Sequence, residues 1–221
     1  MIQIGENAWQ IPVMPRQALN CFLLGDVLVD AGMFFSRGRI LAALQGKAVG
    51  AHALTHAHVD HQGATAAIAR ALNLPVWCHG IERNAVETGD VTGSFANPRA
   101  LTARLQQRFL AGDGHPVARA LAEGDSVGGF EVIETPGHTA GHISFWRASD
   151  GLLVAGDAAL GMHLLTTRPG MHLPYAHVSW DMDHVRASIR KLAALGPRRV
   201  AFGHGPAVPG EVFTGFAAGL A

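Results

Sequence analysis

Three histidines and an aspartate stand within residues 56–61, which read HAHVDH. Neutral imidazoles and carboxylates are the ligands that Zn, Fe, Mn and Ni accept in proteins. One metal ion could not easily use all four side chains, whereas two adjacent ions could. A chance cluster of structural histidines is the alternative, and the density of the cluster disfavours it. The segment therefore predicts a metal site.

The segments around this cluster predict where it lies in the fold. Residues 48–54 form a short apolar run typical of a buried strand, and residues 64–72, after Gly63, read as a helix. The cluster therefore occupies a strand-to-helix loop. An apolar strand that ends in glycine beside one ligand-type side chain recurs at His138, Asp157 and His204. Strands of stacked sheets that end at one edge would gather these side chains into a single cleft.

The rest of the chain alternates predicted strands and helices. Short apolar runs between residues 2 and 30, with a hairpin turn at Gly25-Asp26, predict an antiparallel opening sheet. Helices are predicted at 36–44, 80–86, 100–110 and 181–195, and strands at 75–78, 126–127, 130–134, 143–147, 152–155 and 199–202. Residues 87–124 are the least regular part, and residues 161–180, with Pro169, Gly170 and Pro174, predict a long loop.

Composition narrows the class of protein. The 221 residues suffice for one substantial core, and no linker or charge block divides them, so we expect a single domain over 1–221. Lys+Arg 17 balance Asp+Glu 17, which disfavours a nucleic-acid partner. The first residues resemble no signal peptide and no apolar stretch approaches a membrane span, so we expect a cytoplasmic protein without membrane contact. Cys21 and Cys78 lie in apolar runs and predict buried, reduced thiols.

Four motifs together resemble the metallo-β-lactamase superfamily. They are HAHVDH at 56–61, TPGHT at 135–139, AGD at 155–157 and GHGP at 203–206, and they follow the family's order. The resemblance implies an α/β fold, the four-layer αββα metallo-β-lactamase-like sandwich, with two metal ions at one edge. Matched to the family motif, the first metal has His56, His58 and His138, the second has Asp60, His61 and His204, and Asp157 bridges them.

The same resemblance implies a function. A hydroxide shared by two divalent metal ions would hydrolyse a small ester, thioester, lactone or amide. Asp60 would act in catalysis, accepting a hydrogen bond from the hydroxide and passing a proton to the leaving group. We expect zinc, with iron or manganese as alternatives, and a small, apolar-to-neutral molecule as the substrate.

Departures from individual branches of the family narrow this prediction. A β-lactamase in the strict sense usually has cysteine where Asp157 stands, so antibiotic hydrolysis is disfavoured. Only residues 211–221 follow the last ligand loop, which removes support for the glutathione thioesters of glyoxalase II. The lactonase branch places a tyrosine soon after the bridging aspartate, whereas Tyr175 is the only tyrosine here. Two alternatives stay open: a mononuclear iron persulfide dioxygenase, and a non-catalytic metal-bound regulatory or ligand-binding module.

Residues beyond the ligands are predicted from their position. Phe34 and Phe35 follow a turn that borders the site in the family, and His163 and Tyr175 belong to the predicted 161–180 loop. All four are predicted to line the substrate pocket. His142, four residues after His138, is either a residue that orients a ligand or a purely structural one. The sequence specifies neither the substrate nor the oligomeric state.

Overall fold

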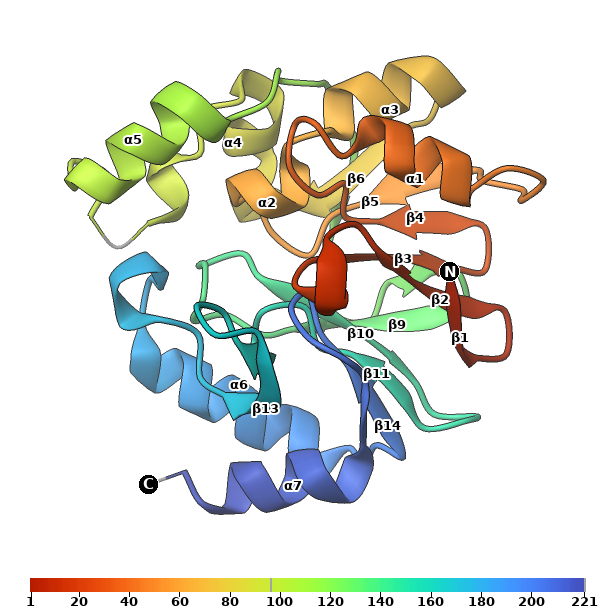
Figure 1. Ribbon diagram of the computed structural model, residues 1–221, viewed down its shortest axis with the longest axis vertical. Helices are drawn as coiled ribbons and strands as arrows, with labels where there is room; N and C mark the ends of the chain where they lie inside the picture. The colour runs from red at the N-terminus through yellow and green to blue at the C-terminus, as the bar shows by residue number, and fades with distance from the viewer. Residues whose placement is uncertain (96, 221) are drawn as a thin grey trace.

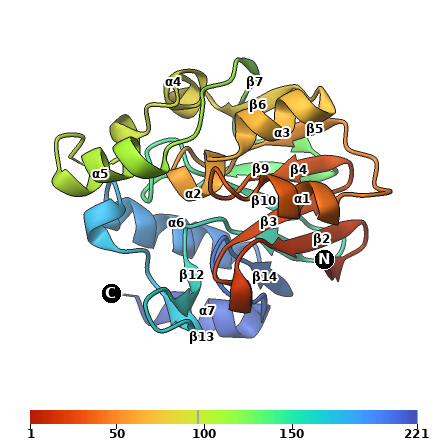
Figure 2. The ribbon, with the colours of Figure 1, turned by 45° about the horizontal axis from the view of Figure 1, so that its top comes forward.

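Two mixed β-sheets face each other, and helices cover both outer faces (Figure 1). The computed structural model describes residues 1–95 and 97–220. Helices α1 (Arg37–Ala43) and α3 (Thr65–Leu72) lie against one sheet, and α6 (Met182–Ala194) and α7 (Gly210–Ala218) lie against the other (Figures 1 and 2). This order of layers is the predicted αββα sandwich.

The first sheet has the strand order β1-β2-β3-β4-β5-β6-β7. Its strands β1 to β4 pair antiparallel, and β4 to β7 pair parallel. The predicted hairpin turn joins β3 to β4, where Gly25 has φ +57°, a conformation that glycine adopts without strain. The strands are β1 Ile2–Gly5, β2 Ala8–Pro12, β3 Asn20–Leu24, β4 Val27–Val29, β5 Ala51–Ala53, β6 Val76–His79 and β7 Val117–Leu121.

The second sheet has the order β15-β14-β11-β10-β9-β8. Only β11 and β14 pair parallel within it, and this pair brings the ends of two ligand-bearing strands side by side. The strands are β8 Ser126–Val127, β9 Phe130–Glu134, β10 Ile143–Arg147, β11 Leu152–Val154, β14 Arg199–Ala201 and β15 Val208–Pro209.

Two predictions about irregular segments are wrong. Residues 161–180 do not form one long loop, because β12 Leu160–His163 and β13 Arg168–His172 pair as a separate antiparallel hairpin. Pro169 and Gly170 misled the prediction, since a two-stranded hairpin has only edge strands, which tolerate both residues. The stretch 87–124, predicted to be the least regular, likewise contains the strand β7, which forms one edge of the first sheet.

Helices α1, α3, α4, α5 and α6 agree with the predicted positions to within a few residues, whereas α2, which lies in the predicted loop, and α7 were not predicted. Asp181 caps α6 by accepting hydrogen bonds from the backbone N–H groups of Asp183 and His184. Ser36 precedes α1 but makes no side-chain cap. The α-helices are α1 Arg37–Ala43, α2 Val59–Gln62, α3 Thr65–Leu72, α4 Arg83–Thr88, α5 Leu101–Leu110, α6 Met182–Ala194 and α7 Gly210–Ala218, and the 3-10 turns are Pro15–Gln17, Gly80–Glu82, Thr92–Ser94 and Ala176–Val178.

Alternation along the strands builds the core. In β3, Phe22 and Leu24 point between the sheets, whereas Cys21 and Leu23 point outward toward α1 and α3. Both cysteines are buried and free, as predicted. Within the described part of the chain, none of the helices combines the length and the apolarity needed to cross a bilayer.

Candidate metal centre

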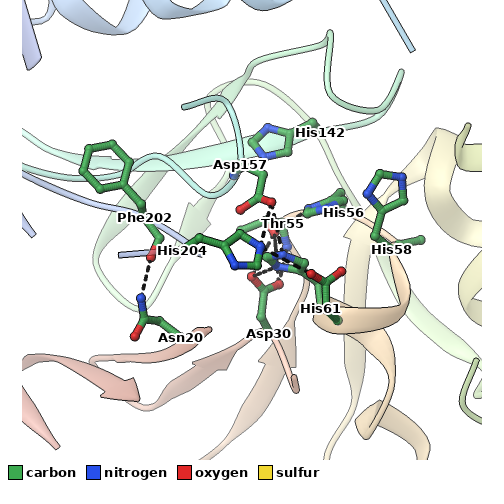
Figure 3. Close-up of polar contacts among 12 residues, drawn as sticks. Asn20, Asp30, Thr55, His56, His58, His61, His142, Asp157, Phe202 and His204 are labelled. Atoms are coloured by element: carbon green, nitrogen blue, oxygen red, sulfur yellow. Dashed lines mark hydrogen bonds and ion pairs between the residues drawn. The ribbon is translucent and has the colours of Figure 1, made fainter. Parts of the chain in front are cut away.

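All seven predicted metal ligands meet at one edge of the sandwich, where strands of both sheets end. Figure 3 labels His56, His58, His61, Asp157 and His204 among them. His56 and His58 follow β5, Asp60 and His61 lie in α2, His138 follows β9, Asp157 follows β11, and His204 follows β14. These residues form three groups, and within each group one potential ligand atom per residue lies within 4.8 Å of the others. The groups are His56 with His58 and His138, His56 with His61 and Asp157, and Asp60 with His61 and His204.

Asp157 lies between the predicted ligand groups. Its Oδ2 is 3.1 Å from Nε2 of His204, 3.5 Å from Nε2 of His61 and 3.7 Å from Nε2 of His138. His204 Nε2 is also 3.3 Å from Oδ2 of Asp60. One carboxylate therefore faces histidines of both predicted sites, and a bridging ligand needs this position.

Unpartnered buried atoms test whether the cluster fits metal ions. Nε2 of His56, Nε2 of His61 and Oδ1 of Asp157 are buried and have no hydrogen-bond partner among the described residues. Nδ1 of His58 and Nε2 of His138 lie 2.9 Å apart, so either one ring donates a hydrogen bond to the other or both nitrogens direct lone pairs at one ion. Such nitrogens fit a shared positive ion, so the residues present suit a metal centre.

The opposite ring nitrogens of four histidines contact fixed partners. Since the Ser179 hydroxyl donates to the Tyr175 carbonyl and the Thr55 hydroxyl donates to Asp30, both hydroxyl oxygens accept from an imidazole N–H. When the ring is neutral, each contact leaves Nε2 as the lone-pair nitrogen that faces the cluster. The contacts are His56 Nδ1 to Thr55 Oγ1 at 3.0 Å, His61 Nδ1 to Asp30 Oδ2 at 2.8 Å, His138 Nδ1 to Ser179 Oγ at 3.1 Å, and His204 Nδ1 to the Ala18 carbonyl at 2.6 Å.

Asp30 is a functional residue that the sequence reasoning missed. It is fully buried and accepts hydrogen bonds from the N–H and the hydroxyl of Thr55 besides the contact with His61. It follows the apolar strand β4, just as Asp157 follows β11. A carboxylate at the end of an apolar strand was therefore a usable signal.

Burial and neighbouring charges shift the histidine pKa values in opposite directions at the two predicted sites. At the three-histidine site, burial lowers the pKa of His56, His58 and His138, and neighbouring histidines lower those of His56 and His138 further. These rings are therefore neutral donors at neutral pH.

At the other site the carboxylates dominate. Burial opposes the charged form of both histidines, but Asp157, with Asp30 and Asp60, raises the pKa of His61 well above its ordinary value. Asp157 and Asp60 likewise raise the pKa of His204 to about 10. Although burial alone would raise the pKa values of Asp60 and Asp157, the imidazolium charges of His61 and His204 lower both.

His142 holds the backbone of the central carboxylate. Its Nε2 accepts the N–H of Asp157 at 2.9 Å, and its Nδ1 lies 2.8 Å from the hydroxyl of Thr135. Burial lowers the pKa of His142 to about 3, so the ring remains a neutral acceptor. Of the two readings left open by the sequence, these contacts support the orienting role.

A cavity of about 170 Å³ opens over the cluster. Tyr175 lies in its wall, and the tyrosine hydroxyl is buried without a hydrogen-bond partner among the described residues. His163 lies beside Tyr175, with ring centroids 6.3 Å apart, but is not part of the wall. Phe34 and Phe35 are 49% and 60% exposed and lie outside it. The wall consists of His58, Asp60, Gln106, His138, Asp157, Leu160, Leu164, Pro174, Tyr175, Val178 and His204.

Known proteins resemble this chain in sequence and in fold. The family model of the metallo-β-lactamase superfamily matches residues 16–204. The probable metallo-hydrolase YflN of Bacillus subtilis is 35% identical over 206 residues, which cover 85% of this chain and 78% of that protein. The hydroxyacylglutathione hydrolase of Rhizobium johnstonii is 44% identical over only 93 residues, 39% of this chain and 32% of that enzyme.

Two solved structures cover nearly the whole chain. TTHA1623 in a di-iron-bound form has a TM-score of 0.72 and 30% identity, over 92% of this chain and 96% of that one. The B3 metallo-β-lactamase BLEG-1 has a TM-score of 0.72 and 28% identity, over 92% and 94%.

Proposed function

Because the chain belongs to the metallo-β-lactamase superfamily, we propose that it is a dinuclear metal-dependent hydrolase of a small, uncharged ester, thioester or lactone. The observation that carries this proposal is the position of Asp157, whose carboxylate faces histidines of both predicted sites within 3.7 Å. The relative that was solved in a di-iron-bound form supports a centre of two ions.

Seven residues would hold the ions. His56, His58 and His138 would hold one, Asp60, His61 and His204 the other, and Asp157 would contact both. Two divalent ions would supply a hydroxide at neutral pH and polarise the carbonyl of the substrate. We expect zinc, and the di-iron relative makes iron the first alternative.

Asp60 is proposed to move the proton. Its side chain is 30% exposed and lies in the cavity wall, so Oδ2 can reach both the cluster and a bound substrate. The low pKa of Asp60 keeps it ionised, so Oδ2 can accept a hydrogen bond from the nucleophile. From Oδ2 the proton can pass to the leaving group.

The cavity wall supports an uncharged substrate. Leu160, Leu164, Pro174 and Val178 form its apolar part, and no lysine or arginine lies among its described residues. A carboxylate or phosphate bound against this apolar part, away from the metal ions, would lack a lysine or arginine partner. The Tyr175 hydroxyl, which has no protein partner, is proposed to donate a hydrogen bond to a substrate oxygen.

Metal analysis combined with a substrate panel tests the proposal. Protein purified without chelator should contain close to two zinc-type or iron ions per chain and hydrolyse a short-chain lactone or thioester without consuming oxygen. Chelator-treated protein should regain activity when metal is restored. A matched ester that carries a free carboxylate should be a poorer substrate than its uncharged analogue.

Other results would identify another function. One iron per chain with persulfide-dependent oxygen uptake would indicate the dioxygenase. Bound metal without turnover of any ester, thioester, lactone or phosphodiester would indicate a binding module. A β-lactam belongs in the panel because of the likeness to BLEG-1, and its efficient hydrolysis would contradict the proposed substrate class.

A further inference from the structure

Glu82 is a buried carboxylate outside the proposed ligand set. It ends the 3-10 turn Gly80–Glu82 that follows β6, and only 3% of its surface is exposed. Its Oε2 accepts hydrogen bonds from the N–H of Ala57 and the hydroxyl of Ser94, both at 3.2 Å. Its Oε1 accepts the N–H of Gly141 at 3.0 Å. One side chain therefore joins three separate segments.

Two of these segments carry the three-histidine site. Ala57 stands between His56 and His58, in the loop after a strand of the first sheet. Gly141 lies in the loop after β9 of the second sheet, which also carries His138. Glu82 thus connects the two halves of the sandwich at the point where both supply ligands.

Gly141 shows how closely the two segments approach. A Cβ atom at this position would lie 2.9 Å from both Cγ and Oε1 of Glu82, closer than unstrained packing allows. Hydrogen bonds to an ionised acceptor are stronger than bonds between neutral groups. A buried backbone N–H that loses its acceptor destabilises the folded protein. The N–H groups of Ala57 and Gly141 therefore bind both loops to the Glu82 carboxylate.

We propose that Glu82 is a positioning residue that fixes the loop of His58 against the loop of His138, and so sets the geometry of the three-histidine site. The facing nitrogens of His58 and His138 are 2.9 Å apart, and they belong to opposite sheets. The inference rests on the proposed function only in that the three histidines bind a metal ion.

The other site provides an internal comparison. His61 is held by Asp30, His204 by the Ala18 carbonyl, and the backbone of Asp157 by His142. None of these three contacts involves Glu82. Loss of the Glu82 carboxylate should therefore weaken the three-histidine site selectively.

The variant Glu82→Gln tests the proposal with little change in shape. Wherever the new NH₂ group lies, it faces a hydrogen-bond donor, and either Ala57 or Gly141 loses its acceptor. The matched control is Glu87→Gln, which makes the same chemical change at an exposed carboxylate on α4. Affinity for Zn²⁺ and Co²⁺ is measured by competition with a chromophoric chelator, in a His204→Ala background for the three-histidine site and in a His138→Ala background for the other.

Loss of a residue that orients metal ligands typically weakens binding about 10–100-fold. We expect a loss of this size at the three-histidine site, a changed Co²⁺ spectrum, and less than about a threefold change at the other site. Unchanged affinity, or equal weakening of both sites, would overturn the proposal. If Glu82→Gln shows no cooperative melting transition, Glu82→Asp is measured instead. Its shorter carboxylate cannot reach both loops, so wild-type metal affinity in Glu82→Asp would contradict the proposal. The readout needs no substrate, so failure of the proposed reaction is detected separately.

Discussion

The two halves of the metal centre differ in the partners that surround their histidines. His56 and His138 contact the neutral hydroxyls of Thr55 and Ser179, whereas His61 contacts the carboxylate of Asp30 and His204 lies close to Asp60 and Asp157. The same side chain is therefore a weak base in one half and a strong base in the other.

The pKa directions express this difference. Burial lowers the pKa values of the three-histidine group, and carboxylates raise those of His61 and His204. The three-histidine half offers lone pairs to a metal ion without first losing protons. The carboxylate-rich half couples metal binding to proton transfer, and Asp60, the proposed proton carrier, belongs to it.

Removing the carboxylate that joins the halves should have the largest effect. Asp157→Ala should lose at least one metal ion per chain, because Oδ2 of Asp157 faces histidines of both groups. A catalytic metal ion contributes several kcal/mol, so kcat/KM should fall about a thousandfold. Elemental analysis and steady-state kinetics measure both, with Asp113→Ala, an exposed aspartate paired with Arg70, as the control. Unchanged metal content would remove Asp157 from the bridging role.

The second-largest expected effect is a difference between the two sites in how their metal affinity changes with pH. Below its pKa of about 10, His204 must release a proton before it can bind a metal ion. Affinity of the carboxylate-rich site should therefore rise about tenfold per pH unit for each proton released, so the proton of His204 alone gives about 100-fold between pH 7 and 9 and a proton released from His61 adds to this rise. The three-histidine site should change little over this range, because its rings are already neutral. Calorimetric titrations in buffers of different ionisation enthalpy count the protons, and equal release at both sites would contradict the comparison.

The third prediction concerns Asp30. In Asp30→Asn the amide NH₂ must face either His61 or the N–H of Thr55, so one donor loses its acceptor. Affinity of the carboxylate-rich site should fall about 10–100-fold. The three-histidine site should change less, since Asp30 reaches it only through Thr55. Asp26→Asn, at the exposed hairpin turn, is the control, and a larger loss at the three-histidine site would reverse the assignment.

Local patterns predicted the clustering of the ligands, whereas the αββα fold and the division of the ligands into two sites were implied by the resemblance of the motifs to the family. Five of the seven ligands follow an apolar strand and Asp60 and His61 lie in the short helix α2 just beyond one, and parallel or stacked strands that end at one edge bring such residues together. The contacts of Glu82 could not be predicted in this way. Its partners Ala57 and Gly141 are 25 and 59 positions away, and Glu82 itself lies in a short helical segment that gives no sign of burial. The β12–β13 hairpin was missed for a related reason, since its strands pair only with each other and carry residues typical of loops.

Tyr175→Phe should have the smallest effect, and it examines the wall of the cavity. Ser179 donates to the Tyr175 carbonyl and accepts from His138, so the tyrosine is held by the three-histidine half. Its hydroxyl has no protein partner among the described residues. Loss of one hydrogen bond to substrate costs about 1 kcal/mol, so kcat/KM should fall about fivefold to tenfold while metal content stays unchanged. His177→Ala is the control, because it removes the ring stacked on Tyr175 at 5.6 Å without altering the cavity wall. If both variants lose the same activity, Tyr175 acts through the packing of the loop. If only Tyr175→Phe loses activity, the three-histidine half, which binds metal without releasing protons, also orients the substrate.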